Sequence, residues 1–187
     1  MTKGRCFGKS SYLEIIMKKA LLAAGLAAVL GLLGFSQSSP SQKIEDQVVS
    51  TLLSLPLYGV FDNLAYELEG TNVVLSGQVL MPITKEEAGK RVARIQGIGK
   101  LTNSIEILPL SGIDDAIRLR AYRMLFGTAN LYRYSLGANP LIHIIVKGGH
   151  ITLEGIVSSE DDAKLALLSI RGIQDSLSQK SSLKVSK

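Results

Sequence analysis

The sequence predicts an α+β protein made of two tandem α-β-β-α-β modules that follow an N-terminal signal segment. Each module is expected to form a small three-stranded mixed sheet with two helices on one face. Two observations support this prediction. The pattern apolar-x-Leu-polar-Gly-x-Val occurs in Val73–Val79 and again, 78 residues later, in Ile151–Val157, and self-similarity at one spacing is the signature of repeated units. The 187 residues also divide well into a leader and two modules of about 70 residues.

The leader has the layout of a secretory signal peptide. Met17-Lys18-Lys19 is a short positive start, Ala20–Leu33 is an apolar run, and small residues follow it. Such a core is short for a membrane-spanning helix. We predict that residues 1–38 comprise an upstream extension and a signal peptide starting at Met17, that residues 39–42 form a linker, and that the protein is periplasmic. An uncleaved leader that anchors the protein in the inner membrane is the alternative.

Composition excludes several classes of function. Residues 1–36 hold five cations and one anion, while the rest of the chain holds sixteen cations and fifteen anions. The basic character therefore belongs to the leader and gives no support to nucleic-acid binding. The single cysteine, Cys6, provides neither a disulfide framework nor a cysteine-based metal site.

Module one is expected over residues 43–109. Apolar residues at helical spacing from Ile44 to Leu53 predict a first helix. Residues 62–68 and 73–79 alternate around a turn at Gly70, which predicts a β-hairpin. Gly77 lies on the apolar side of the second strand, where a glycine suggests a bulge or a closely packed helix.

The second half of module one contains a helix and a strand. Thr84 and Glu87 are spaced as in a capping box, so we expect the second helix to begin there after Pro82. Gly97 is expected to end that helix. Leu101, Ile105 and Ile107 predict the closing strand.

Module two is expected over residues 113–187. Its first helix repeats that of module one at a spacing of 69 and its hairpin at 78, so about nine extra residues enlarge a loop near residues 127–137. Gly155 is the counterpart of Gly77. Asp175 replaces Gly97 and Gln179 replaces Leu101, so we expect the last strand of module two to be the weaker copy.

These motifs resemble the BON domain (bacterial OsmY and nodulation), and the pair resembles dual-BON periplasmic proteins. The segments that carry the resemblance are Val73–Val79, Gly97–Ile107 and Lys147–Gly155. Module two departs from the pattern after Val157, at Asp175, Ser176 and Gln179. The resemblance implies a non-catalytic envelope protein that associates with phospholipid membranes in envelope maintenance or in an osmotic or other stress response.

The helix expected over Asp114–Phe126 is the main candidate for a binding surface. Ile113, Ile117, Ala121, Met124 and Leu125 form one stripe, which we expect to face the sheet, and a second apolar patch bordered by arginines lies nearly opposite. Apolar residues beside arginines suit an anionic lipid surface. The predicted binding residues of this patch are Arg118, Leu119, Tyr122, Arg123 and Phe126. Packing of the patch against the enlarged loop or against module one is the alternative.

The enlarged loop adds Tyr132, Arg133 and Tyr134 as secondary candidates, because amphipathic rings suit a membrane interface. Residues 43–109 carry a net charge of −2 and residues 113–187 a net charge of +3. The basic second module could therefore face lipid, or the two modules could simply attract each other.

The sequence offers no constellation for catalysis. His143 alternates away from the apolar stripe of its strand and is expected on the outer face of the sheet, while His150 lies at a hairpin turn. Neither has carboxylate or cysteine neighbours at ligand spacing, so we predict no metal, no cofactor and no enzymatic activity. The predicted partner is an anionic phospholipid surface. The alternative function is a periplasmic protein-interaction or chaperone-like module that binds envelope proteins. The sequence does not indicate an oligomeric state.

Overall fold

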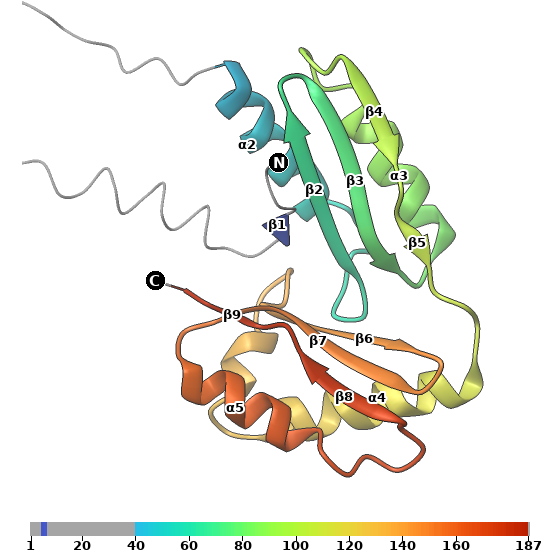
Figure 1. Ribbon diagram of the computed structural model, residues 1–187, viewed down its shortest axis with the longest axis vertical. Helices are drawn as coiled ribbons and strands as arrows, with labels where there is room; N and C mark the ends of the chain where they lie inside the picture. Colours follow the sequence, from blue (N-terminus) through green and yellow to red (C-terminus); the bar gives the residue numbers. More distant parts are fainter. Residues whose placement is uncertain (1–4, 7–39, 187) are drawn as a thin grey trace, which may run out of the picture.

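The computed structural model of the protein describes residues 5–6 and 40–186 (Figure 1). The predicted signal peptide and its cleavage site lie outside the described residues. Two small α+β modules follow each other, each a mixed sheet with two helices on one face. The predicted fold class is therefore confirmed. In the part of the chain that the structure describes, no helix is long and apolar enough to cross a membrane.

Module one is built around the hairpin of β2 and β3. These strands are antiparallel, and the short closing strands β4 and β5 both run parallel to β3. The helix α2 begins at Pro40, so residues 40–42 belong to it and not to a linker; proline is well suited to a first helical turn. The elements of module one are α2 (Pro40–Leu53), β2 (Asn63–Glu69), β3 (Asn72–Val79), α3 (Pro82–Val92), β4 (Lys100–Asn103) and β5 (Glu106–Ile107).

Module two repeats the same order and the same pairing. Its strands β8 and β9 run parallel to β7 and begin 78 residues after β4 and β5. The last strand is thus as long as its counterpart, despite Gln179. The elements of module two are α4 (Gly112–Gly127), the 3-10 helix η1 (Tyr132–Ser135), β6 (Ile142–Lys147), β7 (His150–Val157), α5 (Glu160–Ser169), β8 (Ser178–Ser181) and β9 (Lys184–Val185).

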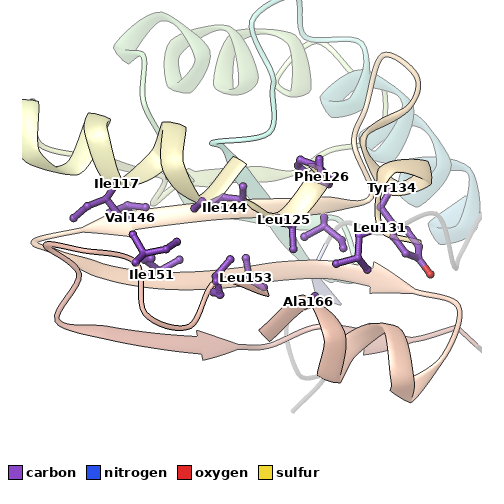
Figure 2. Close-up of a cluster of buried hydrophobic side chains, with 14 of the residues drawn as sticks. Ile117, Leu125, Phe126, Leu131, Tyr134, Ile144, Val146, Ile151, Leu153 and Ala166 are labelled. Atoms are coloured by element: carbon purple, nitrogen blue, oxygen red, sulfur yellow. The ribbon is translucent and has the colours of Figure 1, made fainter. Parts of the chain in front are cut away.

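The core of module two lies between its sheet and its two helices (Figure 2). Ile117, Ala121 and Leu125 of the predicted stripe are fully buried there. Two other members of that stripe were predicted wrongly, because Ile113 is 65% exposed and Met124 is 43% exposed. Both lie at the margin of the helix face that meets the sheet.

One glycine in each hairpin permits its two strands to approach each other closely. Gly77 has a φ of 107°, and a Cβ there would lie 2.0 Å from the carbonyl oxygen of Asn63. Gly155 has a φ of 124°, and its Cβ would lie 2.1 Å from the oxygen of Leu141. The neighbour that requires glycine is therefore the backbone at the start of the partner strand, and not a helix.

The position after the second helix is left-handed in both modules. Gly97 has a φ of 93°, and Asp175 adopts a φ of 68° at the matching place. Aspartate is among the residues that tolerate this region. The substitution noted in the sequence therefore keeps the backbone conformation of the turn.

The predicted capping box at Thr84 is wrong. The helix α3 begins at Pro82, and its N-cap residue is Met81, which provides no side-chain hydrogen bond. Thr84 is buried within the first turn, and its hydroxyl has no hydrogen-bond partner. Proline at the first helical position places the N-cap at Met81, three residues ahead of the expected cap.

A short strand from the N-terminal region extends the sheet of module one. The two residues of β1 (Arg5–Cys6) pair antiparallel with β2, opposite Tyr66 and Ala65. No pattern in the sequence predicts this pairing.

The two modules meet at a junction formed by residues 58–61, the loop before β2, and strand β6 (Figure 1). The amide of Ile144 donates a hydrogen bond of 2.7 Å to the carbonyl oxygen of Val60. Val60 and Phe61 also pack against the core of module two. Lys147 forms an ion pair of 2.6 Å with Glu106 across the modules. Module one thus closes the outer edge of β6.

Candidate functional site

The candidate site is the solvent-facing side of α4. The helix begins with Ser111, whose hydroxyl accepts a hydrogen bond of 3.2 Å from the amide of Asp114. Its buried residues pack on β6, and this contact fixes which side of the helix remains open. The open side carries both apolar and cationic residues.

The open side of α4 combines three apolar side chains with two arginines. Leu119 is 51% exposed and Tyr122 is 40% exposed, and Met124 is also exposed. Arg120 and Arg123 lie between them in sequence and are exposed as well. We refer to these five residues as the α4 surface. Such a mixture of apolar residues and arginines is characteristic of helices that bind at a lipid interface.

A hollow of about 290 Å³ adjoins the α4 surface. Arg120 borders it and forms an ion pair of 2.7 Å with Asp175 from the loop before β8. The hollow therefore combines a guanidinium-rich border with an apolar floor. Its lining residues are Arg120, Arg123, Met124, Gly172, Ile173 and Gln174.

Arg118 was predicted to border the lipid-binding patch, but only 2% of its surface is exposed. Its guanidinium donates a hydrogen bond of 2.7 Å to the carbonyl oxygen of Val146 and pairs with Asp115. Its Nε has no hydrogen-bond partner. The position of Arg118 on the helix directs it to the outer edge of β6, so it serves the packing of α4 on that strand and not an external ligand.

The predicted aromatic pair has two different environments. Phe126 is buried in the core of module two, so its assignment to a binding surface is not supported by its position. The Tyr122 ring contacts both the Phe126 ring, at 5.1 Å between centroids, and the Phe61 ring of module one, at 6.2 Å. The alternative of packing against module one thus applies to part of the patch, while Leu119 and Arg123 stay open.

The three predicted binding residues of the enlarged loop also differ in their exposure to solvent. Tyr132 and Arg133 are exposed, whereas Tyr134 is buried. The hydroxyl of Tyr134 donates a hydrogen bond of 2.8 Å to Asp162, and Arg133 forms an ion pair of 2.6 Å with the same carboxylate. Burial would raise the pKa of Asp162, but the hydrogen bonds from Tyr134 and Ser159 and the charge of Arg133 outweigh it and lower that pKa. Tyr134 therefore fixes the loop on α5.

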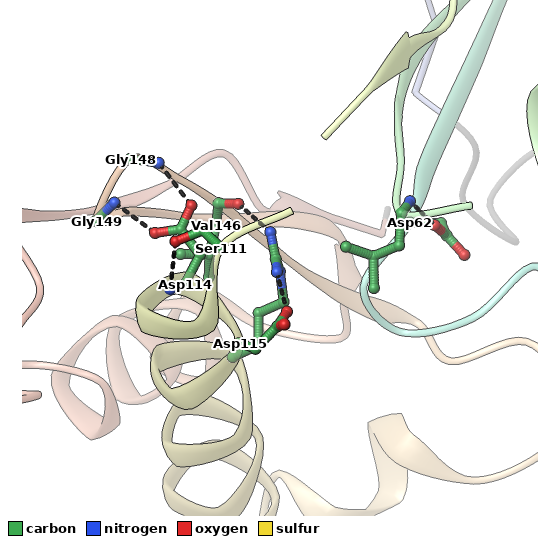
Figure 3. A network of polar contacts seen from close by, with 9 residues as sticks. Asp62, Ser111, Asp114, Asp115, Val146, Gly148 and Gly149 are labelled. Carbon is green, nitrogen blue, oxygen red and sulfur yellow. Dashed lines mark hydrogen bonds and ion pairs between the residues drawn. The ribbon is translucent and has the colours of Figure 1, made fainter. Parts of the chain in front are cut away.

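A second buried carboxylate connects α4 to the hairpin of module two (Figure 3). Asp114 accepts hydrogen bonds of 2.8 Å from the amides of both Gly148 and Gly149. The acidic start of this helix is thus tied to the turn of the hairpin. Among the described residues, no group of three His, Cys, Asp or Glu side chains could hold a metal ion.

The sequence reasoning missed two residues of the α4 surface. Met124 was assigned to the buried stripe, although its place at the margin of that stripe was a warning. Arg120 is a third arginine beside the predicted patch, but it is not among the predicted binding residues. The site is displaced because β6 and the core of module two bury Arg118 and Phe126, and Phe61 of module one covers part of Tyr122. These contacts join residues that are far apart in the sequence, so no local pattern reveals them.

Comparisons with known proteins show only distant likeness. No protein-family model matches the chain, and no curated protein matches it either. A structure of CdsD, a structural protein of the type III secretion system of Chlamydia trachomatis, is 10% identical, with a TM-score of 0.28 over 75% of this chain and 91% of that chain. The C-terminal domain of CdsD is 11% identical, with a TM-score of 0.27 over 75% of this chain and 96% of that chain. Likeness at this level carries no argument about function, and what stands is a tandem of two small α/β modules.

Proposed function

We propose that this chain is an exported, non-enzymatic envelope protein of the dual-BON type that binds anionic phospholipid surfaces through the α4 surface. Envelope maintenance or a response to osmotic or other stress would be its role in the cell. The observation that carries the proposal is the exposure of Leu119, Tyr122 and Met124 beside Arg120 and Arg123. Tyr132 and Arg133, which are also exposed, are secondary contacts.

The physical basis is apolar insertion combined with attraction to lipid phosphates. Each cation near an anionic leaflet contributes about 1 kcal/mol. The apolar side chains of a helix lying in the interface add to this by burial between headgroups. Arg123 and Leu119 are four residues apart, so both lie on one side of the helix.

Vesicle flotation of the mature chain, without the predicted signal peptide, tests the proposal, with phosphatidylcholine vesicles compared with vesicles that also contain phosphatidylglycerol. Reversal of one charge by Arg123→Glu should weaken binding to anionic vesicles about 30-fold, since it changes the local charge by two. Leu119→Glu in addition should abolish flotation. The matched control is Leu168→Glu with Lys164→Glu, an exposed leucine and cation four residues apart on α5.

Equal recovery with neutral and anionic vesicles would contradict the proposal. So would equal losses in the α4 and α5 double variants, since the effect would then lie in overall charge. The alternative of strand addition by a protein partner has less support in module two, because Val60 and Arg118 already occupy hydrogen-bonding groups on the edge of β6.

A further inference from the structure

His143 lies inside the junction between the modules. Only 2% of its surface is exposed. Its Nδ1 lies 3.2 Å from the carbonyl oxygen of Gly59, and its Nε2 lies 3.4 Å from the hydroxyl of Tyr58. The rings of His143 and Tyr58 are also 5.3 Å apart. The expectation that His143 lies on the outer face of its sheet was correct in direction, but module one covers that face.

These contacts fit the neutral imidazole. The Gly59 oxygen can only accept, so Nδ1 carries the hydrogen and donates it. Nε2 is then the acceptor, and the Tyr58 hydroxyl donates to it. A second proton on Nε2 would require the Tyr58 hydroxyl to turn and accept instead of donate, and at 3.4 Å this contact is long for a bond to a charged ring. The main cost of protonation in the closed junction is therefore the burial of a charged ring away from water, which separation of the modules would relieve.

The surrounding charges give a protonated His143 little compensation. Asp62, from the same loop, uses one oxygen for the amide of Gly59 and the other for that of Leu80. Burial raises the pKa of Asp62 and also that of Glu154, which lies opposite His143 on β7. Both carboxylates therefore lose charge as the pH falls. The nearby cations are Arg118, which interacts with Asp62, and Lys180 and Lys184, which interact with Glu154.

We propose that the junction is an acid-sensitive contact, in which protonation of His143 separates residues 58–61 of module one from β6. Separation would break the hydrogen bond between Ile144 and Val60 and would release the Phe61 ring from Tyr122. It would also expose the outer edge and outer face of β6. The inference concerns the contact between modules and does not depend on lipid binding.

The direction of the pH effect follows from the position of the proton. Burial lowers the pKa of His143 from 6.5 to about 4. The closed junction is thus fully stable above pH 6.5 and loses stability as the pH falls towards 4. Relative to pH 7.5, the separated fraction should rise roughly 30-fold at pH 5. Asp62 and Glu154 act in the opposite sense, because their protonation relieves the burial of charge.

Hydrogen exchange of the full chain without lipid tests the inference. The readout is the exchange of the Ile144 amide relative to the β3 amides (Asn72–Val79), which corrects for the intrinsic effect of pH. This ratio should rise about 30-fold from pH 7.5 to pH 5. His143→Gln should remove the rise, and the matched control His150→Gln should retain it, since His150 is exposed.

Two results would overturn the inference. One is an equal rise in the wild-type chain and in His143→Gln, which would assign the effect to other groups. The other is no rise in the wild-type ratio of Ile144 exchange to β3 exchange. This ratio also stays constant if acid accelerates both rates equally, which would mean that acid unfolds the whole protein. Lipid flotation at pH 7.5 is unaffected by either result, so failure here leaves the proposed function standing.

Discussion

The two modules share a fold, but they stabilise equivalent places with different chemistry. In module two, Asp114 of the first helix binds the two amides of the hairpin turn. In module one, the equivalent Glu45 accepts a hydrogen bond of 2.9 Å from the hydroxyl of Tyr66 on the strand. The start of the second helix differs too, since Ser159 and Asp162 form side-chain hydrogen bonds there, while Met81 forms none and the Thr84 hydroxyl lacks a partner.

This difference indicates how the repeat diverged. The backbone constraints, such as Gly77 and Gly155, are retained because the hairpin cannot form without them. The polar contacts are not retained, and in module two Asp114 and Arg118 form such contacts from the helix that carries the candidate site. Module two therefore holds α4 in place by buried hydrogen bonds as well as by apolar packing.

The largest effect should come from the shared backbone constraint. Gly77→Ala and Gly155→Ala should each destabilise their own module by more than about 3 kcal/mol, because the new Cβ overlaps a backbone oxygen. Hydrogen exchange of β3 and of β7 reports on each module separately. The matched controls are Gly70→Ala and Gly148→Ala, which occupy left-handed turns with open space and should cost about 1 kcal/mol.

If either substitution lowered the stability of both modules equally, the two cores would not be independent. Such a result would mean that the junction makes the two modules unfold together.

The second largest effect should come from the acidic residue at the start of the first helix, which has a different partner in each module. Asp114→Ala should destabilise module two by about 2–3 kcal/mol, because it leaves two turn amides without their acceptor. Glu45→Ala should cost module one less, about 1 kcal/mol, since it removes the acceptor of the Tyr66 hydroxyl and not that of two backbone amides. Exchange of the Gly149 and Tyr66 amides measures the two losses. Equal losses would show that the contact to the turn has no special weight.

Much of the fold could be predicted because it depends on local patterns. Alternation and helical spacing located both hairpins and all four main helices, and the 78-residue spacing aligned even the broken closing strands. The junction could not be predicted, because it depends on Val60 and His143, which are 83 residues apart. Arg118, Phe126 and Tyr134 were misplaced for the same reason. Their positions in the sequence match an exposed patch. In the structure, however, Arg118 is buried against β6, Phe126 in the core of module two, and Tyr134 against α5.

The smallest effect tests the N-caps of the second helices, where Ser159 accepts a hydrogen bond from the Asp162 amide and Met81 has no equivalent. Ser159→Ala should destabilise module two by about 1 kcal/mol, because the Asp162 amide loses its acceptor at 3.1 Å. Met81→Ser should stabilise module one by about 0.5–1 kcal/mol, since the extended backbone at Met81 already suits a cap. Exchange of amides in the first turns of α3 and α5 measures both. If Met81→Ser gave no gain, the cap would not limit module one. The absence of polar contacts there would then reflect a core that does not need them, not a loss of stability tolerated after duplication.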